Sequence, residues 1–121
     1  MGVSGLIWAG LAVQDLEQAI VFYRDVMGFH LRRSNNDWAV FDAGGGALFE
    51  LSRGGTMNLA AKTAAQQSLV VGFKVDNLPE TVKKLKERGV YFMGEMEAYK
   101  SSRWIKFVDR EGNVLELKEV L

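Results

Sequence analysis

The sequence contains one strand–turn–strand pattern twice. WAVFDAGGGALFEL, residues 38–51, aligns with WIKFVDREGNVLEL, residues 104–117, at a constant shift of 66 positions. Chance similarity between amphipathic strands explains alternating apolar residues, but not the same tryptophan, glycine and glutamate at fixed spacing. An internal duplication is therefore the main constraint on the fold. The identical pairs are Trp38/Trp104, Phe41/Phe107, Gly46/Gly112, Glu50/Glu116 and Leu51/Leu117.

The repeat extends upstream, where each half has an apolar run followed by a predicted helix. Each helix begins at a residue suited to capping, Asp15 or Asn77, whose side-chain oxygen accepts a free backbone N–H. Pro79 fits the first turn, and the two helices are predicted to stop at Gly28 and Gly89. The predicted apolar faces are Leu16, Ala19, Ile20 and Tyr23 in the first helix, and Leu78, Val82 and Leu85 in the second.

Each half therefore reads strand, helix, strand, strand, strand. We predict an α+β fold in which two tandem βαβββ modules, residues 5–53 and 68–121, form a single domain over residues 1–121. The modules are expected to form a curved mixed sheet, a cup with the helices on its outer face. About four extra residues of the second half fall within residues 94–102. Residues 54–67 form a linker, with a turn at its Gly-Gly start and a composition that allows a short helix.

Composition excludes several kinds of function. Fifteen basic residues balance fifteen acidic ones, so no net charge attracts nucleic acid or an anionic membrane. The chain has no cysteine, which excludes disulfides, thiolate nucleophiles and thiolate metal sites. No apolar run approaches the roughly 20 residues of a membrane span. The N-terminus lacks the basic start and long apolar core of a signal peptide, so a cytoplasmic protein is expected.

Two motifs carry a resemblance to a known family. VQDLEQAIVFYRDVMGF in the first half and FVDREGNVLEL in the second resemble the vicinal oxygen chelate superfamily. That superfamily includes glyoxalase I, extradiol dioxygenases, fosfomycin resistance enzymes and bleomycin-binding proteins. The resemblance covers essentially the whole chain and implies the fold, but not one reaction, because this scaffold supports many chemistries. It also implies a homodimer, since family members often build their cups from paired modules.

The resemblance implies a metal site that this chain lacks the residues to form. Metal-dependent members carry ligands on the first and fourth strands of each module, and these positions correspond here to Trp8, Glu50, Val70 and Glu116. Both glutamates are present, but both of the usual histidines are replaced. Indole has no lone pair free for a metal, valine has no donor atom, and two carboxylates alone bind transition metals poorly. We predict that there is no metal and no other cofactor.

His30 is the only histidine and follows Gly28 and Phe29. It stands beside Arg32 and Arg33 at the start of a predicted strand. An exposed residue at a strand edge is expected there, rather than a metal ligand or a general base.

Strand alternation identifies the side chains that share a face with the two glutamates. Aromatic walls around central carboxylates suit stacking and hydrogen bonding to a planar or amphipathic molecule. The carboxylates are expected to share a hydrogen bond, to have a lysine partner such as Lys106, or to meet a cationic or hydrogen-donating ligand. The candidate ligand-binding residues are Trp8, Trp38, Glu50, Val70, Trp104, Lys106 and Glu116, and the same alternation adds Lys74 and Lys118.

Three functions fit these residues. The prediction is a metal-independent protein that binds a small molecule. The first alternative is a glyoxalase-class lyase or isomerase, with Glu50 or Glu116 as general base and Lys74, Lys106 or backbone N–H groups as the electrophile. The second is an interaction or regulatory module in which side chains fill the cup and the glutamates are inherited remnants.

Overall fold

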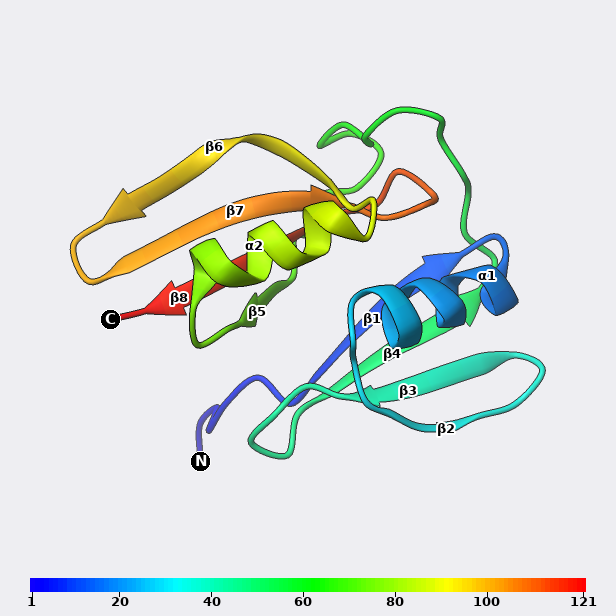
Figure 1. The fold of residues 1–121 in the computed structure, drawn as a ribbon. Helices are drawn as coiled ribbons and strands as arrows, with labels where there is room; N and C mark the ends of the chain where they lie inside the picture. The colour runs from blue at the N-terminus through cyan, green and yellow to red at the C-terminus, as the bar shows by residue number, and fades with distance from the viewer. The chain divides into compact units, whose positions relative to one another are not determined.

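The computed structural model describes residues 1–121 and divides into two compact units, Met1–Thr56 and Met57–Leu121. The first contains β1 (Trp8–Val13), α1 (Leu16–Val21), the π-helical turn η1 (Phe22–Val26), β2 (Leu31–Ser34), β3 (Trp38–Asp42) and β4 (Leu48–Arg53). The second contains β5 (Gly72–Lys74), α2 (Leu78–Glu87), β6 (Tyr91–Tyr99), β7 (Ser102–Val108) and β8 (Val114–Val120) (Figure 1). The predicted α+β fold with two tandem βαβββ modules is confirmed.

The two sheets have the same topology and register. Their strand orders are β1-β4-β3-β2 and β5-β8-β7-β6, so the last strand of each module lies between the first and the third. The first strand pairs with the last in parallel, and the other pairs are antiparallel. In both sheets the repeated glutamate lies between a glycine of the first strand and a residue of the third: Gly10–Glu50–Val40 and Gly72–Glu116–Lys106.

The predicted helix ends are confirmed. The side chains of Asp15 and Asn77 each accept the backbone N–H of the third residue that follows, at 3.1 Å in both helices. These bonds satisfy donors that have no partner within the helix. Gly28 and Gly89 follow the helical segments with φ values of +78° and +88°, a left-handed conformation that costs glycine little.

The first helical segment stops before Gly28 as predicted, but its last turn widens into the π-helical turn η1. The N–H of Met27 donates to the carbonyl of Phe22, five residues earlier, at 2.9 Å. Phe22 and Tyr23 are both buried, while Ile20, which was predicted on the buried face, is only half-buried. A change of helical pitch is not visible in a sequence pattern read at 3.6 residues per turn.

An aromatic cluster forms the core of the first unit. The rings of Tyr23, Phe29, Phe41 and Phe49 all contact one another, with centroids 5.3 to 6.3 Å apart. Tilted and edge-on contacts at such distances add to the stabilisation from burial. Two of these rings come from the antiparallel strands β3 and β4, so the cluster joins the sheet to the helical segment.

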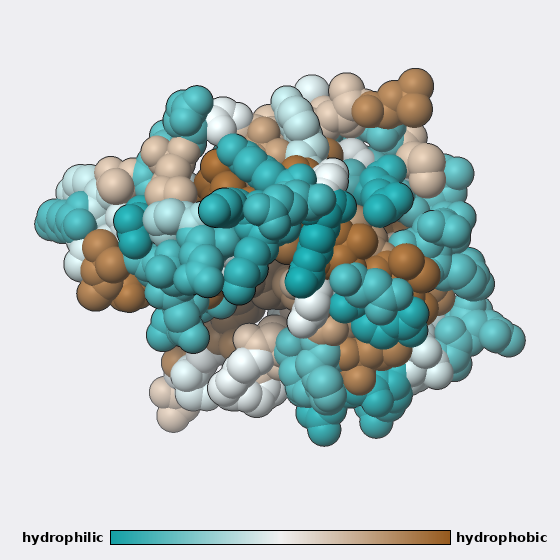
Figure 2. Space-filling model, in the orientation of Figure 1, coloured by the Kyte–Doolittle hydropathy of each residue, from teal (hydrophilic) through white to brown (hydrophobic).

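In the second unit, α2 packs its apolar stripe on the sheet of β5–β8. Leu78, Val82 and Leu85 are buried, as predicted, and hydrophilic side chains cover the opposite side of the helix (Figure 2). Ile105, Leu115 and Leu117 are buried on the facing strands, and Phe92 contacts Phe107 at a centroid distance of 6.5 Å. Neither helix is long and apolar enough to cross a lipid bilayer.

A partly buried ion pair fixes the start of α2. Glu119 of β8 is only 3% exposed and accepts the backbone N–H of Leu78 at 2.6 Å. Arg103 of β7 donates to the same carboxylate at 2.8 Å. The carboxylate thus lies at the positive end of the helix dipole with its charge paired, which makes burial of that charge tolerable.

The short helix allowed within the linker is not formed. Instead, the carbonyl of Thr63 accepts the N–H groups of Gln66 and Gln67, which makes a turn. The N–H groups of Asn58 and Lys62 donate to the turn between β7 and β8, at 2.9 and 2.8 Å. The helix does not form because these long-range bonds engage backbone groups that a local helix would have used.

The linker holds that turn with side chains as well. Lys62 Nζ donates to Asn113 Oδ1 at 2.6 Å, and the Gln67 amide bonds both the N–H and the carbonyl of Val114. Gly112 has a φ of +83°, and a Cβ placed on it would lie 2.5 Å from the carbonyl oxygen of Ala60. The β7–β8 turn therefore has linker backbone packed directly against it.

We expect Gly112→Ala to destabilise the protein more than Gly46→Ala. Gly46 is the repeat equivalent, with a φ of +84°, so an alanine strains the backbone at either position. A Cβ placed on Gly46 would have no atom within 4 Å, so only the change at Gly112 displaces the linker. Gly46→Ala should lower the free energy of unfolding by about 1 kcal/mol and Gly112→Ala by about 2–4 kcal/mol, as measured by urea titration. Equal losses would contradict the packing of the linker on the turn.

Candidate functional site

Each sheet has one face covered by the helix of its own module; the opposite face is called the helix-free face here. On the first sheet, strand alternation and register place Trp8, Trp38 and Glu50 together on this face. Glu50 occupies the central strand β4 and is half-buried. Its repeat equivalent, Glu116, is also half-buried.

The indole of Trp8 lies across Gly10, two residues further along β1. A Cβ placed on Gly10 would fall 2.3 Å from Cη2 and 2.6 Å from Cζ2 of that ring. Gly10 pairs with Glu50 on the next strand, so the indole lies over the strand position that neighbours the carboxylate. Trp8 is nonetheless 50% exposed, which leaves much of its surface available for stacking.

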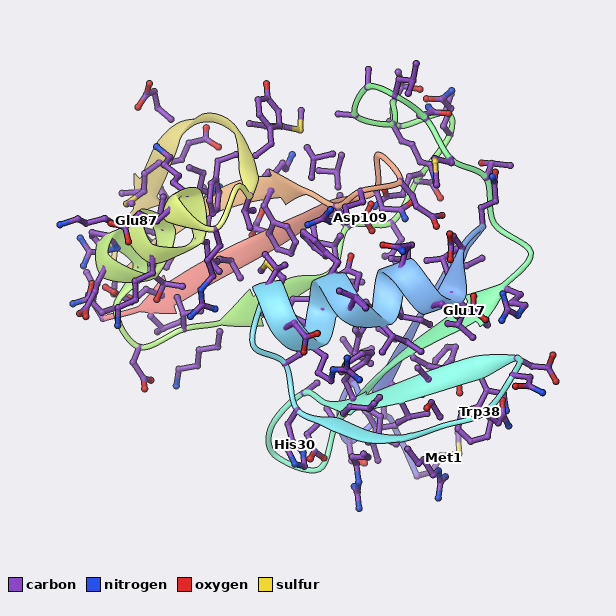
Figure 3. All side chains as sticks on the ribbon, turned by 45° about the vertical axis from the view of Figure 1, so that its right-hand side comes forward. Met1, Glu17, His30, Trp38, Glu87 and Asp109 are labelled. Carbon is purple, nitrogen blue, oxygen red and sulfur yellow. The ribbon has the colours of Figure 1, made fainter.

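His30 and Trp38 lie toward opposite ends of the β2–β3 hairpin (Figure 3), and each end has a basic group. At one end, the guanidinium of Arg33 lies 5.7 Å from the ring centroid of Trp38, within cation–π range. At the other, His30 Nδ1 lies 2.6 Å from Asp42 Oδ2, and Arg32 is 3.4 Å from the same carboxylate. The His30 side chain is 77% exposed, as expected for a residue at a strand edge.

The helix-free face of the second sheet is ordered in rows across the strands. One row contains Gly72, Glu116, Lys106 and Met93, and the next contains Lys74, Lys118, Trp104 and Glu97. In the second row, Lys118 Nζ lies 5.2 Å from the ring centroid of Trp104. The indole N–H of Trp104 donates to Glu97 at 3.2 Å. Val70 lies two residues before β5 and is exposed.

A pocket of about 540 Å³ opens beside these rows, entirely within the second unit. Its strand residues include Met93, which belongs to the row of Glu116. Sequence reasoning did not find this pocket, because its other wall comes from the linker and depends on the contact with the β7–β8 turn. The lining residues are Leu59, Ala60, Ala61, Tyr91, Met93, Val108 and Asp109.

Asp109, labelled in Figure 3, organises the β7–β8 turn. Its Oδ1 accepts the backbone N–H groups of Glu111 and Asn113, both at 2.9 Å. Its Oδ2 accepts the side-chain amide of Asn113 at 3.0 Å. The motif DREGN therefore has a structural role in this chain, and its carboxylate is occupied by the turn.

The side chains at the family's metal positions do not fit a transition metal. The positions of Trp8 and Val70 supply no donor atom, and His30 is engaged with Asp42 at the edge of the first sheet. Within the described residues, no group of three or more histidine, cysteine, aspartate or glutamate side chains is arranged to hold a metal ion. The remaining carboxylates, Glu50 and Glu116, are hard oxygen ligands without imidazole to add affinity and selectivity.

Residues 5–117 match the sequence profile of the Glyoxalase/Bleomycin resistance protein/Dioxygenase superfamily. The chain belongs to this superfamily. One relative, the uncharacterized protein YraH of Bacillus subtilis, is 28% identical over 126 residues, covering 96% of this chain and 98% of the relative.

Solved structures support the same superfamily fold. A putative glyoxalase family protein from Bacillus anthracis has a TM-score of 0.78 at 17% identity, covering all of this chain and 98% of its own. FosX, a fosfomycin resistance protein from Listeria monocytogenes solved with Mn(II) and sulfate, has a TM-score of 0.74 at 20% identity, covering 99% of this chain and 93% of its own. Lactoylglutathione lyase from Agrobacterium tumefaciens has a TM-score of 0.73 at 18% identity, covering 98% and 96%.

We expect Gly10→Ala to displace the indole of Trp8. Alanine suits a strand at least as well as glycine, so the main effect is the collision with the ring. In a Trp38→Phe, Trp104→Phe background, where Trp8 is the only tryptophan, acrylamide quenching of its fluorescence should increase by about twofold as the ring moves toward solvent. Unchanged quenching and emission would contradict the placement of Trp8 over Gly10.

Proposed function

We propose that this protein binds a planar or amphipathic small molecule without using a metal ion. The observation that carries the proposal is the indole of Trp8, which takes the place of the family's imidazole and lies over Gly10 beside Glu50. A half-exposed aromatic ring next to a half-buried carboxylate offers a stacking surface and a hydrogen-bond acceptor. It offers no coordination chemistry at that position.

The second module supports the same proposal with a different surface. Trp104 is half-buried and held on two sides, by the contact with Lys118 and by the bond to Glu97, so its ring is oriented in advance. The neighbouring pocket is lined mainly by apolar side chains and has the volume of a small-molecule site. A pre-oriented ring reduces the side-chain entropy lost when a ligand binds.

A glyoxalase-class lyase or isomerase is the second candidate, and one observation favours it. Glu116 and Lys106 are directly opposite each other on β8 and β7, which sets a general base beside a cation that could stabilise an enediolate. The resemblance in fold to FosX and to lactoylglutathione lyase is a reason to assay this activity. A cytoplasmic homodimer completes the proposal, and light scattering after size exclusion checks the oligomer.

We expect ligand affinity to be independent of metal. An aromatic ligand found by tryptophan quenching should bind chelator-treated protein with a Kd within about twofold of that for protein given nickel, zinc or manganese. Loss of binding after chelation, with recovery on adding one metal, would overturn the proposal.

We expect Glu50→Gln or Glu116→Gln to weaken that ligand when it donates a hydrogen bond to the carboxylate. The loss should be about tenfold, since hydrogen bonds to charged groups are worth roughly 1.5–3 kcal/mol. Glu87→Gln is the matched control, because Glu87 is exposed at the end of α2 (Figure 3). Isothermal titration calorimetry measures all three variants, and equal affinities in them would remove the glutamates from the site.

The enzymatic candidate is tested with methylglyoxal and glutathione. If this protein is such an enzyme, the unsubstituted protein converts these substrates to product. Glu116→Gln and Lys106→Gln then each lower kcat by about tenfold or more, whereas Glu87→Gln does not. Turnover with these effects would replace the binding proposal with the enzymatic one.

A further inference from the structure

We propose that the helix-free face of the second sheet binds an organic anion, a carboxylate or phosphate attached to an apolar, planar body. This inference rests on the proposed function and specifies the chemical class of its ligand. The anion would lie among Lys74, Lys106 and Lys118, and the apolar body would enter the pocket beside Met93.

The two rows of this face contain three lysines and two glutamates, although the chain as a whole is neutral. Lys74 and Lys118 are direct partners on β5 and β8, and Lys106 is one row away on β7. None of these three lysines takes part in an ion pair. Adjacent like charges on neighbouring strands destabilise a sheet, so a cluster of this kind favours a negatively charged ligand.

The acidic groups on the same face do not balance the lysines. Glu116 is the only carboxylate within the row of Lys106. Glu97 lies in the row of Lys74 and Lys118, on the edge strand β6, and accepts a hydrogen bond from the indole of Trp104. Three lysines therefore share this face with one central carboxylate that no hydrogen bond or ion pair engages. Glu116 is also positioned to accept a hydrogen bond from the ligand, which would favour a molecule that has a donor as well as an anion.

The apolar part of the ligand follows from the pocket. Tyr91 and Met93 line it, and both are exposed although they are large. Met93 pairs directly with Lys106, so the edge of the pocket and the nearest ammonium group are neighbours on adjacent strands. A single small molecule can therefore reach the pocket and the lysines together, because a lysine side chain is flexible and spans several ångströms.

Other occupants fit the charges less well. A cationic ligand would be repelled by the three lysines, although Glu116 alone would attract it. A second copy of the same face, related by a two-fold axis, would bring the two lysine clusters together. Charge complementarity thus favours a small anion over either of them.

The test uses matched probes that share one ring system: 2-naphthoate, 2-naphthyl phosphate, neutral 2-naphthamide and 2-naphthylmethylammonium. In calorimetry with the intact 121-residue chain at low salt, one of the two anions should bind about tenfold more tightly than the amide, and the ammonium most weakly. The advantage of the anion should shrink as salt is added, because solvent reaches these lysines. The tighter of the two anions identifies the carboxylate or the phosphate as the preferred group.

Variants assign the binding to this face. Lys106→Gln/Lys118→Gln should remove most of the anion's advantage, about two- to fivefold for each lysine, and leave amide binding nearly unchanged. Lys83→Gln/Lys86→Gln is the matched control, with the same charge change on the exposed side of α2 in the same module. Thermal unfolding confirms that each variant is folded before titration.

The outcomes separate this inference from the proposed function. If the amide binds as tightly as both anions, or if the two lysine variants behave alike, the inference is overturned while small-molecule binding stands. If no probe and no member of a wider aromatic library binds, both fail. If Met93→Glu lowers the oligomer mass and no probe binds, the face is an interface between two copies, and the inference is again overturned.

Discussion

The parallel pairing of the first and last strands determines the rest of each module. It inserts the last strand between the first and the third, so that β4 and β8 are hydrogen-bonded on both sides. The helix must then cross over one face of the sheet to connect the strands, and the other face is left without a helix. Glu50 and Glu116 occupy the middle of the doubly bonded strands. Their backbone positions are therefore among the best supported on the helix-free faces.

The two modules use this shared framework for different surfaces. Toward the helix, both sheets present apolar side chains. On the other face, the two glutamates occupy equivalent positions in the register of their sheets. On the helix-free side, the first sheet carries Trp8, Trp38 and one arginine near Trp38, whereas the second carries three lysines around Glu116. Alternation along a strand makes this possible, since every second residue can change without altering the core.

Local and repeated features of the fold could be predicted from the sequence, and features that depend on distant contacts could not. Asp15 and Asn77 identify the helix starts because a cap acts within one turn, and the duplication specifies the register once one sheet is known. The widening of the helix at Phe22 instead accompanies the burial of two adjacent aromatic rings, Phe22 and Tyr23. The linker turn and the pocket depend on backbone bonds from Asn58 and Lys62 to a turn about 50 residues later. Strand parity places six of the seven candidate site residues on the two helix-free faces, whereas Val70 lies outside β5. The orientation of Trp8 over Gly10 and the lack of ion pairs at the lysines depend on side-chain conformations, which a sequence pattern does not specify.

The attachment of the linker has a consequence for how such a protein can change. Its backbone N–H groups and the side chains of Lys62 and Gln67 hold the β7–β8 turn, whereas Leu59, Ala60 and Ala61 line the pocket. Within this one short segment, the atoms that bond the turn are therefore different from the side chains that line the pocket. Substitutions at the three lining positions can reshape the cavity while the anchoring bonds persist, so selectivity can diverge here at little cost to folding.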